Sequence, residues 1–337
     1  MTLGDSGDMA IRVTNEHREV CAFLLKTLLD TAPSGDPVVW VDLGCGEGDV
    51  LAVIRAGIPD DLRRRMWYVG CDASDVTRAR AQVASSGLDG RSQCIEGDLT
   101  SETTFRSIVQ ATGDVSMVTL TNVIHEIRPP SALPSVLARA LLLLKPDGYL
   151  VAYDMERLSA GDIWDETEAV TWAFDEIEGM VQMFCRALGV TDGSTVVHWK
   201  HHSTTGWTLL MRGSVLHGGT GVGSWPERAV VAAEQAVVSA VRDKRTHRME
   251  DIGLVLRRLS GLDAETPETR KRVFQALETE FPSLVRDYFA SVIASGGDWA
   301  TGWAALFPSA GEGRSRAQGT SDQGGEERGY KCPESRH

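Results

Sequence analysis

Short apolar runs alternate with amphipathic stretches along the first two thirds of the chain. Many of the runs are apolar at consecutive positions, as expected of parallel strands covered on both faces. Between them lie helical patterns such as residues 15–32, whose apolar side chains form one stripe. The alternation predicts an α/β fold with a doubly wound, mostly parallel sheet. Strands are expected at residues 38–41, 66–72, 92–100 and 115–121, at the end of 141–155, and in a hairpin of 194–202 and 207–214.

The first strand leads into a turn that contains three glycines. Residues 38–50 read VVWVDLGCGEGDV, so the apolar run stops at Asp42 and glycines follow at positions 44, 46 and 48. Glycine accepts positive φ and lets a ligand lie against bare backbone, and residues 49–55 have the pattern of a helix. A strand, a glycine-rich turn and a helix together predict a site for a nucleotide-type cofactor.

The spacing of the glycines distinguishes two classes of cofactor. Dinucleotide-binding folds use Gly-x-Gly-x-x-Gly, with the pyrophosphate at the N-terminus of the helix. Here the spacing is Gly-x-Gly-x-Gly, and an acid two residues earlier would repel a pyrophosphate but suits an ammonium group. The segment resembles the first motif of the class I S-adenosylmethionine-dependent methyltransferases, which argues against a nicotinamide dehydrogenase. The resemblance implies cofactor contacts at Asp42, Gly44, Cys45, Gly46 and Gly48.

Two further strands end near acidic residues. Asp72, followed by Ala73, ends the second strand and is well placed to accept hydrogen bonds from both ribose hydroxyls. The alternative role for Asp72 is the N-cap of a helix at 77–85, because Asp is a favoured cap. In the resembling family, the position of Asp98 meets the adenine amino group, and the backbone N–H of the next residue, here Leu99, meets the ring.

The fourth strand ends in polar residues. The apolar run changes at Asn122, an expected cofactor contact, into Val-Ile-His-Glu-Ile. Polar groups at the carboxyl end of a central parallel strand face the ligand crevice, and the resemblance places this tip against the sulfonium and the methyl acceptor. His125 is the candidate general base because imidazole titrates near neutrality. Glu126 can orient it or bind an amine, and a purely structural role for His125 is an equal alternative.

The resemblance covers five strand and turn elements in order between residues 38 and 155. The last is Leu-Lys-Pro-Asp-Gly at 144–148, which is similar to the Leu-Lys-Pro-Gly-Gly element of the family. It implies a seven-stranded sheet whose last two strands come from the hairpin. The expected organisation is an N-terminal helix region at 1–36, an S-adenosylmethionine-binding domain at 37–216, an appended helical region at 225–308 and a disordered tail at 309–337.

Amphipathic helices are expected in the second half of the chain. Residues 162–188 place apolar side chains three and four positions apart, and their acidic faces are interpreted as solvated, with a surface for a cationic acceptor or basic partner as the alternative. After a glycine-rich linker, helices are expected at 226–245 and 249–259, and two more begin at Pro267 and Pro282. This region could cap the acceptor site, form a homodimer or dock a partner protein, and no motif selects among these.

Composition and charge limit the classes of substrate, ligand and membrane association that are expected. The chain has no run of 18 apolar residues, and its first ten residues carry acids where a signal peptide would be basic, so a cytoplasmic protein without membrane association is expected. The formal net charge is −13, with the acidic excess in residues 1–224, which argues against a nucleic-acid substrate. No metal site is expected, because the six cysteines form no CxxC pair and strand alternation separates His201 from His198 and His202.

These features lead to one principal hypothesis and one alternative. The chain is expected to be an enzyme that transfers a methyl group from S-adenosylmethionine to an oxygen or nitrogen acceptor on a small molecule. In-line displacement needs alignment and exclusion of water, with no covalent enzyme intermediate. The alternative is a regulatory or scaffold module that binds the cofactor and docks a partner protein through its helical region. The formation of methylated product distinguishes the two.

Overall fold

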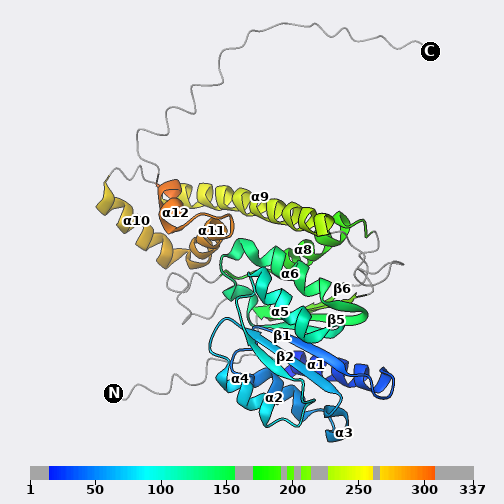
Figure 1. Ribbon diagram of the computed structural model, residues 1–337. Coiled ribbons are helices and arrows are strands. Elements are labelled where there is room, and N and C mark those ends of the chain that lie inside the picture. Colours follow the sequence, from blue (N-terminus) through cyan, green and yellow to red (C-terminus); the bar gives the residue numbers. More distant parts are fainter. Residues whose placement is uncertain are drawn as a thin grey trace, which may run out of the picture.

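The structure, a computed structural model, describes residues 15–155, 170–190, 196–200, 206–213, 227–260 and 266–307 (Figure 1). Its strands are β1 (Val38–Leu43), β2 (Met66–Asp72), β3 (Gln93–Glu96), β4 (Val115–Thr121), β5 (Leu144–Met155), β6 (Val196–Lys200) and β7 (Gly206–Arg212). They form one seven-stranded sheet in the order β3-β2-β1-β4-β5-β7-β6. The first five strands are parallel, whereas β7 runs antiparallel to both β5 and β6. The predicted α/β fold with a mostly parallel seven-stranded sheet is confirmed.

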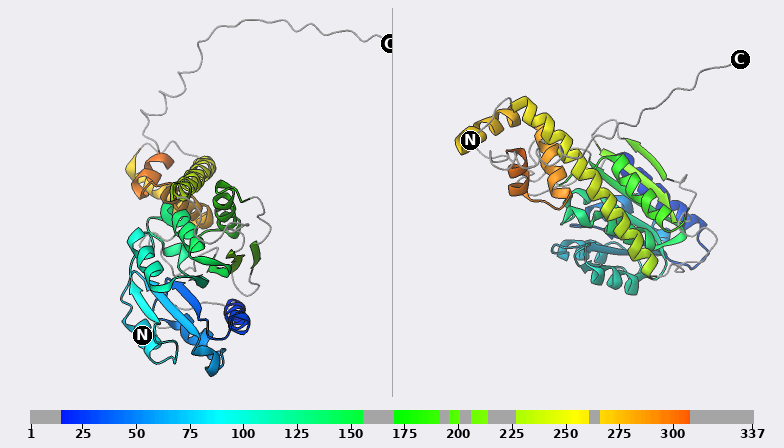
Figure 2. Two further views of the ribbon diagram at one scale, coloured as in Figure 1. Left: turned by 45° about the vertical axis from the view of Figure 1, so that its right-hand side comes forward. Right: turned by 90° about the horizontal axis from the view of Figure 1, so that it is seen from above.

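Helices cover both faces of this sheet (Figure 2). One face is covered by α1 (Asn15–Thr31), α2 (Asp49–Ala56) and α4 (Thr77–Ala84), and the other by α5 (Glu102–Thr112), α6 (Leu133–Leu142) and α8 (Phe174–Ala187). All six residues of β1 are buried, and alternate side chains contribute to the two cores. Val38 and Trp40 pack in the core of the first face, whereas Val39 and Val41 pack in that of the second. Continuous burial explains the unbroken apolar run in the sequence.

The order of the strands reverses between β1 and β4, which pair with each other in the middle of the sheet. In an open α/β sheet, ligands bind outside the carboxyl ends of the strands at such a reversal. The glycine turn follows β1 at this edge, and the 3-10 helix η2 (Ile124–Glu126) follows β4. The topology therefore brings the glycine turn and the polar residues after β4 to one crevice.

The C-terminal part of the described chain is helical. It contains α9 (Glu227–Ser260), α10 (Pro267–Glu280), α11 (Pro282–Ala294) and α12 (Trp299–Leu306). Figure 1 shows α9 crossing the outside of α6 and α8, while α10 to α12 gather near its far end. The two ends of α9 belong to different cores, since Val237 packs in the main core and Leu256 in a separate cluster with α10 to α12. α9 therefore joins the helical region to the sheet domain.

Several predicted boundaries need correction. The two helices expected at 226–245 and 249–259 are one helix of 34 residues, because no glycine or proline interrupts the chain between them. Within the described part of the helix expected at 162–188, residues 170–173 are not helical and α8 begins at Phe174; Ala173 before it is extended, with φ −70° and ψ 151°. The Lys-Pro-Asp-Gly turn lies inside β5, where pairing with β4 shifts between Leu144 and Tyr149.

Other expectations were met or were not testable in the described residues. Thr266 caps α10 through its hydroxyl, which accepts a hydrogen bond from the Thr269 backbone N–H at 3.2 Å. The short helices α3 (Asp60–Arg63) and η3 (Pro130–Ala132) and the last helix α12 were not anticipated. The predicted tail, the glycine-rich linker, His201, His202 and the acidic residues before 170 lie outside the described residues. No helix within the described ranges is long and apolar enough to span a bilayer.

Candidate cofactor and active site

The glycine turn after β1 has one packed side and one open side. Gly44, Gly46 and Gly48 have φ of 78°, 49° and 84°, in the left-handed region that favours glycine. A Cβ on Gly44 would lie 2.4 Å from Cγ2 of Val123, whereas a Cβ on Gly46 would meet no atom within 4 Å. The turn therefore rests on the end of β4 and leaves its backbone at Gly46 free to approach a ligand.

A buried carboxylate lies beneath the turn. Asp42 is 1% exposed, and its two oxygens accept hydrogen bonds from the hydroxyls of Thr119 at 2.6 Å and Tyr68 at 3.0 Å. Trp40 Nε1 donates to the Thr119 oxygen at 2.8 Å, which leaves the Thr119 proton for Asp42. Burial raises the pKa of Asp42 to about 6, while the two hydroxyl donors act in the opposite direction. Asp42 thus supplies negative charge from within the sheet.

Asp72 braces the turn from the end of β2. Its Oδ2 accepts a hydrogen bond from the Gly46 N–H at 2.8 Å, and its Oδ1 accepts one from the Ser74 N–H at 2.8 Å. The alternative role of Asp72 as N-cap of the next helix is wrong, because the N-cap position of α4 is Val76 and has no side-chain hydrogen bond. The half-buried Asp72 and exposed Ala73 lie beside the open side of the turn.

The end of β3 joins the same crevice. The Gly97 N–H donates to the Asp72 carbonyl oxygen at 2.7 Å, which places the next two residues next to Asp72. Asp98 is exposed and accepts a hydrogen bond from the Thr100 N–H at 2.8 Å, whereas Leu99 is 6% exposed. Hydrogen bonds therefore link the predicted residues after β1, β2 and β3 into one continuous edge.

Asn122 carries two unusual features at the end of β4. Its φ of 59° is the one positive φ of a non-glycine residue in the described ranges. Its backbone N–H donates to the Tyr153 carbonyl oxygen at 2.8 Å. Its side-chain Oδ1 is buried and has no hydrogen-bond partner among the described residues. A strained backbone and an unsatisfied buried acceptor together are typical of a ligand contact.

A histidine and an aspartate form a buried pair beside this residue. His125 is 8% exposed, and its Nδ1 lies 2.7 Å from Oδ1 of Asp154, a residue of β5 that is 2% exposed. The other oxygen of Asp154 accepts the His125 backbone N–H at 3.0 Å. With Nδ1–H donated to a carboxylate, Nε2 is the ring's free acceptor, and it lies 3.7 Å from Oε1 of the exposed Glu126.

The charge of Asp154 governs the protonation of His125. Burial alone would lower the pKa of the imidazole, but the adjacent Asp154 carboxylate and Glu126 outweigh burial, so the pKa is raised above its ordinary value. The Arg128 guanidinium acts against them, although it is directed to the His125 carbonyl oxygen at 3.0 Å. Asp154 was not predicted from the sequence, although it is an acid at the end of a parallel strand, the same signal that identified Asp72.

His17 is a polar residue of α1 and is fully buried. Its ring nitrogens lie 3.3 Å from the hydroxyls of Thr121 and Thr208, and its ring lies 4.9 Å from that of Tyr153. Helix α1 is thereby fixed to the ends of β4, β5 and β7, on the sheet side of the crevice.

A family model described as "Methyltransferase domain" matches residues 13–187, which is more than half of the chain. The chain belongs to this methyltransferase domain family. The matched region begins before α1 and ends with α8, so it contains the whole crevice described above. No match was found among curated proteins.

Solved structures with a similar fold are distant from this methyltransferase-domain chain. An O-methyltransferase family protein from Burkholderia thailandensis is 16% identical over 58% of this chain and 56% of its own, with a TM-score of 0.39. The mitomycin 7-O-methyltransferase MmcR is 17% identical over 57% of this chain and 54% of its own (TM-score 0.38). The [4+2]-cyclase SpnF is 14% identical over 81% of this chain and 74% of its own (TM-score 0.36). The chain thus spans a little over half the length of the first two.

The residues of the crevice fit S-adenosylmethionine. The open side of Gly46 offers a backbone cradle, the buried charge of Asp42 suits an ammonium group, and Asn122 Oδ1 is an acceptor in need of a donor. The half-buried carboxylate of Asp72 lies at the position expected for a ribose. The described residues contain no group of three or more His, Cys, Asp or Glu side chains that could hold a metal ion.

Proposed function

We propose that this protein is an S-adenosylmethionine-dependent methyltransferase that methylates a hydroxyl group of a small molecule. The observation that carries the proposal is the buried His125–Asp154 pair beside the glycine turn. A module that only binds the cofactor has no use for an oriented base at this place. A hydroxyl acceptor does need one, because its oxygen must lose a proton as it attacks.

The cofactor contacts proposed here are those at the carboxyl edge of the sheet. Gly44, Gly46, Gly48 and Cys45 shape the turn, with Asp42 beneath it and Asn122 at its side. Asp72 and Ala73 hold the ribose, while Asp98 and the Leu99 N–H meet the adenine. When bound, S-adenosylmethionine supplies a methyl group on a sulfonium, which is electrophilic without further activation.

His125 is the proposed general base and Asp154 its positioning partner. Nε2 of His125 accepts the proton of the acceptor hydroxyl, and Asp154 holds Nδ1–H at 2.7 Å and balances the imidazolium that results. Burial of both side chains excludes water from the pair. Alignment of the reacting groups supplies most of the rate, since orientation is worth as much as ~7–11 kcal/mol.

The charges around the pair bear on the class of acceptor. Glu126 lies beside Nε2 of His125, and Arg128 donates to the backbone carbonyl oxygens of His125 and Ile127. An anionic acceptor would be repelled by Glu126 and Asp154, so a neutral or cationic small molecule fits better. The net charge of −13 argues in the same direction against nucleic acids.

The experiment is a turnover assay with panels of phenols, alcohols and amines, in which S-adenosylhomocysteine is measured by mass spectrometry. We expect turnover with a hydroxyl compound, and a loss of about 10²- to 10⁴-fold in His125→Ala. The exposed Arg106→Ala on α5 serves as a control and should keep full activity. Binding of the cofactor without product from any panel would favour the regulatory module. Equal activity of His125→Ala would remove the base.

A further inference from the structure

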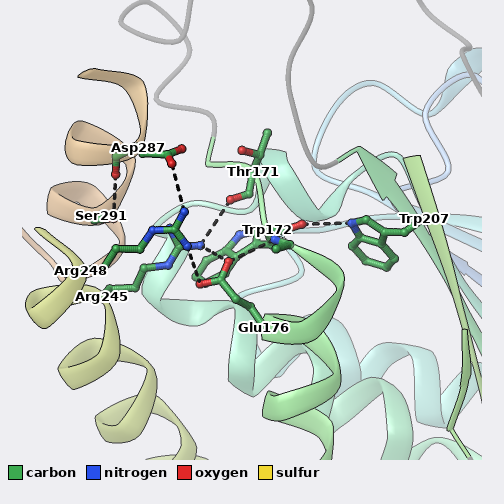
Figure 3. Close-up of polar contacts among 9 residues, drawn as sticks. Thr171, Trp172, Glu176, Trp207, Arg245, Arg248, Asp287 and Ser291 are labelled. Atoms are coloured by element: carbon green, nitrogen blue, oxygen red, sulfur yellow. Dashed lines mark hydrogen bonds and ion pairs between the residues drawn. The ribbon is translucent and has the colours of Figure 1, made fainter. Parts of the chain in front are cut away.

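Helix α9 carries a buried arginine that reaches into the methyltransferase domain (Figure 3). Arg245 is 3% exposed, and its Nη2 donates to Oε2 of Glu176 at 2.7 Å and to the Thr171 carbonyl oxygen at 3.4 Å. Its guanidinium carbon lies 4.3 Å from the centre of the Trp172 ring, in stacking contact. Arg245 of the helical region therefore contacts two residues just before α8, Thr171 and Trp172, and one in its first turn, Glu176.

Further contacts hold the start of α8 next to this segment. Glu176 accepts the backbone N–H of Ala173 at 3.1 Å, which caps the first turn of α8. Arg248, one turn after Arg245, lies 4.0 Å from Glu176 and 3.1 Å from Asp287 of α11 (Figure 3). The buried charge of Glu176 is thus matched by α9, and the start of α8 is tied to the helical region.

Residues 170–172 form hydrogen bonds to His125 itself and to the strand neighbour of Asp154. The Val170 N–H donates to the His125 carbonyl oxygen at 3.2 Å. The Trp172 carbonyl oxygen accepts Nε1 of Trp207 at 3.0 Å, and Trp207 is the β7 residue directly opposite Asp154 in the ladder with β5. A displacement of residues 170–172 would therefore shift both His125 and Asp154.

We propose that Arg245 is a positioning residue for the methyl-transfer reaction, holding residues 170–172 so that His125 and Asp154 keep their alignment. The inference rests on the proposed role of His125 as base. It assigns the C-terminal helical region a part in the active site, since α9 completes the support of the base from outside the methyltransferase domain.

A purely stabilising role does not require this arrangement. Buried ion pairs are often no better for stability than apolar side chains of the same volume, because the desolvation of two charges is costly. A guanidinium offers what an apolar side chain lacks, namely directed donors to a carboxylate and a carbonyl in one plane. That geometry specifies where Thr171 and Trp172 lie, which suits a positioning role.

The test compares Arg245→Lys, Glu176→Gln and the control Glu234→Gln. Lysine keeps the charge but loses the planar fork and the stacking on Trp172. Glutamine at 176 keeps an acceptor for the Ala173 N–H but removes the charge. Glu234 is also on α9 and pairs with Arg139 of α6 at 3.7 Å, so its variant loosens the same helix away from residues 170–172.

Three measurements are made on each full-length variant. The first is kcat with the hydroxyl acceptor, the second is the Kd for S-adenosylmethionine by calorimetry, and the third is the proton resonance of the His125 Nδ1–H, identified by its absence in His125→Gln. In Arg245→Lys and Glu176→Gln we expect kcat to fall about 10- to 100-fold, as sub-ångström misplacement of a base does. The Kd should change less than twofold, and the Nδ1–H should exchange at least tenfold faster. Glu234→Gln should change none of the three.

The double variants with His125→Ala decide between positioning and general damage. If Arg245 acts through His125, Arg245→Lys will reduce the residual rate of His125→Ala less than twofold. Independent, multiplicative losses, or an unchanged Nδ1–H exchange rate in both single variants, would overturn the inference. If the Nδ1–H responds but no acceptor is methylated by the wild type, the coupling stands and the proposed function fails.

Discussion

At the scale of single residues, the pairing of His125 with Asp154 sets the charge on the imidazole. Both carboxylate oxygens of Asp154 face His125, one at Nδ1 and the other at the backbone N–H. The raised pKa of His125 means that pairing stabilises the folded state below about pH 6.5 and that this contribution fades as the pH rises through the raised pKa. The same protonation removes the base, so activity and stability should have opposite pH dependence here.

We therefore expect Asp154→Asn to change the pH profile as well as the rate. Without the carboxylate, burial dominates and the pKa of His125 falls, so the acid limb of kcat should move to lower pH. The maximal rate should fall by about 10²-fold or more, because the asparagine no longer balances the imidazolium. The profile is measured from pH 5 to 9 in Asp154→Asn and wild type. An acid limb that moves to higher pH would contradict this account of the pair.

Asp42 provides a prediction about stability. Its pKa of about 6 in the folded state lies above the ordinary 3.8, so the folded state is relatively favoured below about pH 4 and loses that advantage as the pH rises through 6. Asp42→Asn should therefore be more stable than wild type at pH 7.5 by about 1–3 kcal/mol, with little difference at pH 4. Urea unfolding at the two pH values measures this. The same variant should bind S-adenosylmethionine more weakly, and a gain in both properties would remove the electrostatic role.

Site residues could be predicted from the sequence where both the residue type and its position relative to a strand pointed to a ligand site. The glycines, Asp72 and His125 lie at or shortly after the carboxyl ends of strands, so their places could be expected from the pattern. Asp154 carried the same signal, but its role depends on pairing with His125, which is 29 residues away. The burial of His17 was not predicted, because it depends on how α1 packs against Thr121 and Thr208.

At the scale of elements, two glycines of the same turn have different roles: Gly44 packs against the protein, and Gly46 faces the ligand site. Gly44→Ala introduces a Cβ 2.4 Å from Val123 at a positive φ, so we expect a loss of folding stability of about 2 kcal/mol or more. Gly46→Ala has open space and a φ of 49°, so its folding cost should be near 1 kcal/mol. The alanine methyl group at position 46 would occupy the open side of the turn where the cofactor is proposed to bind, and we expect the Kd for S-adenosylmethionine to rise at least tenfold.

Thermal unfolding and calorimetric binding on the two alanine variants check this contrast. Binding of the cofactor by Gly46→Ala as tight as that of the wild type, or a smaller loss of stability in Gly44→Ala than in Gly46→Ala, would contradict the separate roles of the two glycines.

Element boundaries were predictable where glycine or proline marks them and uncertain elsewhere. Thr266-Pro267 and Phe281-Pro282 gave the starts of α10 and α11 correctly. The start of α8 at Phe174 was missed because the apolar spacing continues through Val170, which packs in the core although residues 170–173 are not helical. Burial of Trp172 and Glu176 under α9 is a tertiary effect that local periodicity does not contain.

At the scale of the whole molecule, α9 connects the two parts of the described chain. Ala233, Val237 and Val241 belong to the same core as β1, β4 and α8, so the helical region is not an independent module. We expect a single cooperative unfolding transition by calorimetry. Val237→Ala should lower its stability by about 1–3 kcal/mol, because a buried side chain at the shared interface is truncated. Two resolved transitions, only one of them sensitive to Val237, would contradict the shared core.

The fold of the sheet domain was largely predictable, and the role of the helical region was not. The sheet domain repeats a pattern of strands and turns that fixes its order, whereas amphipathic helices alone do not specify what they cover. The buried Arg245 was hidden among the 11 basic residues of 225–297, all of which looked equally exposed in the sequence.

The most direct test of the account is calorimetric binding of S-adenosylmethionine and S-adenosylhomocysteine, with NAD as the control ligand, on wild type and Asp72→Ala. We expect micromolar binding of both adenosyl ligands and none of NAD. Asp72→Ala should weaken binding by about 1.5–3 kcal/mol, as loss of a charged hydrogen-bond partner does. Absence of binding by the wild type, or a preference for NAD, would contradict the assignment of the crevice to S-adenosylmethionine and with it the proposed methyl transfer.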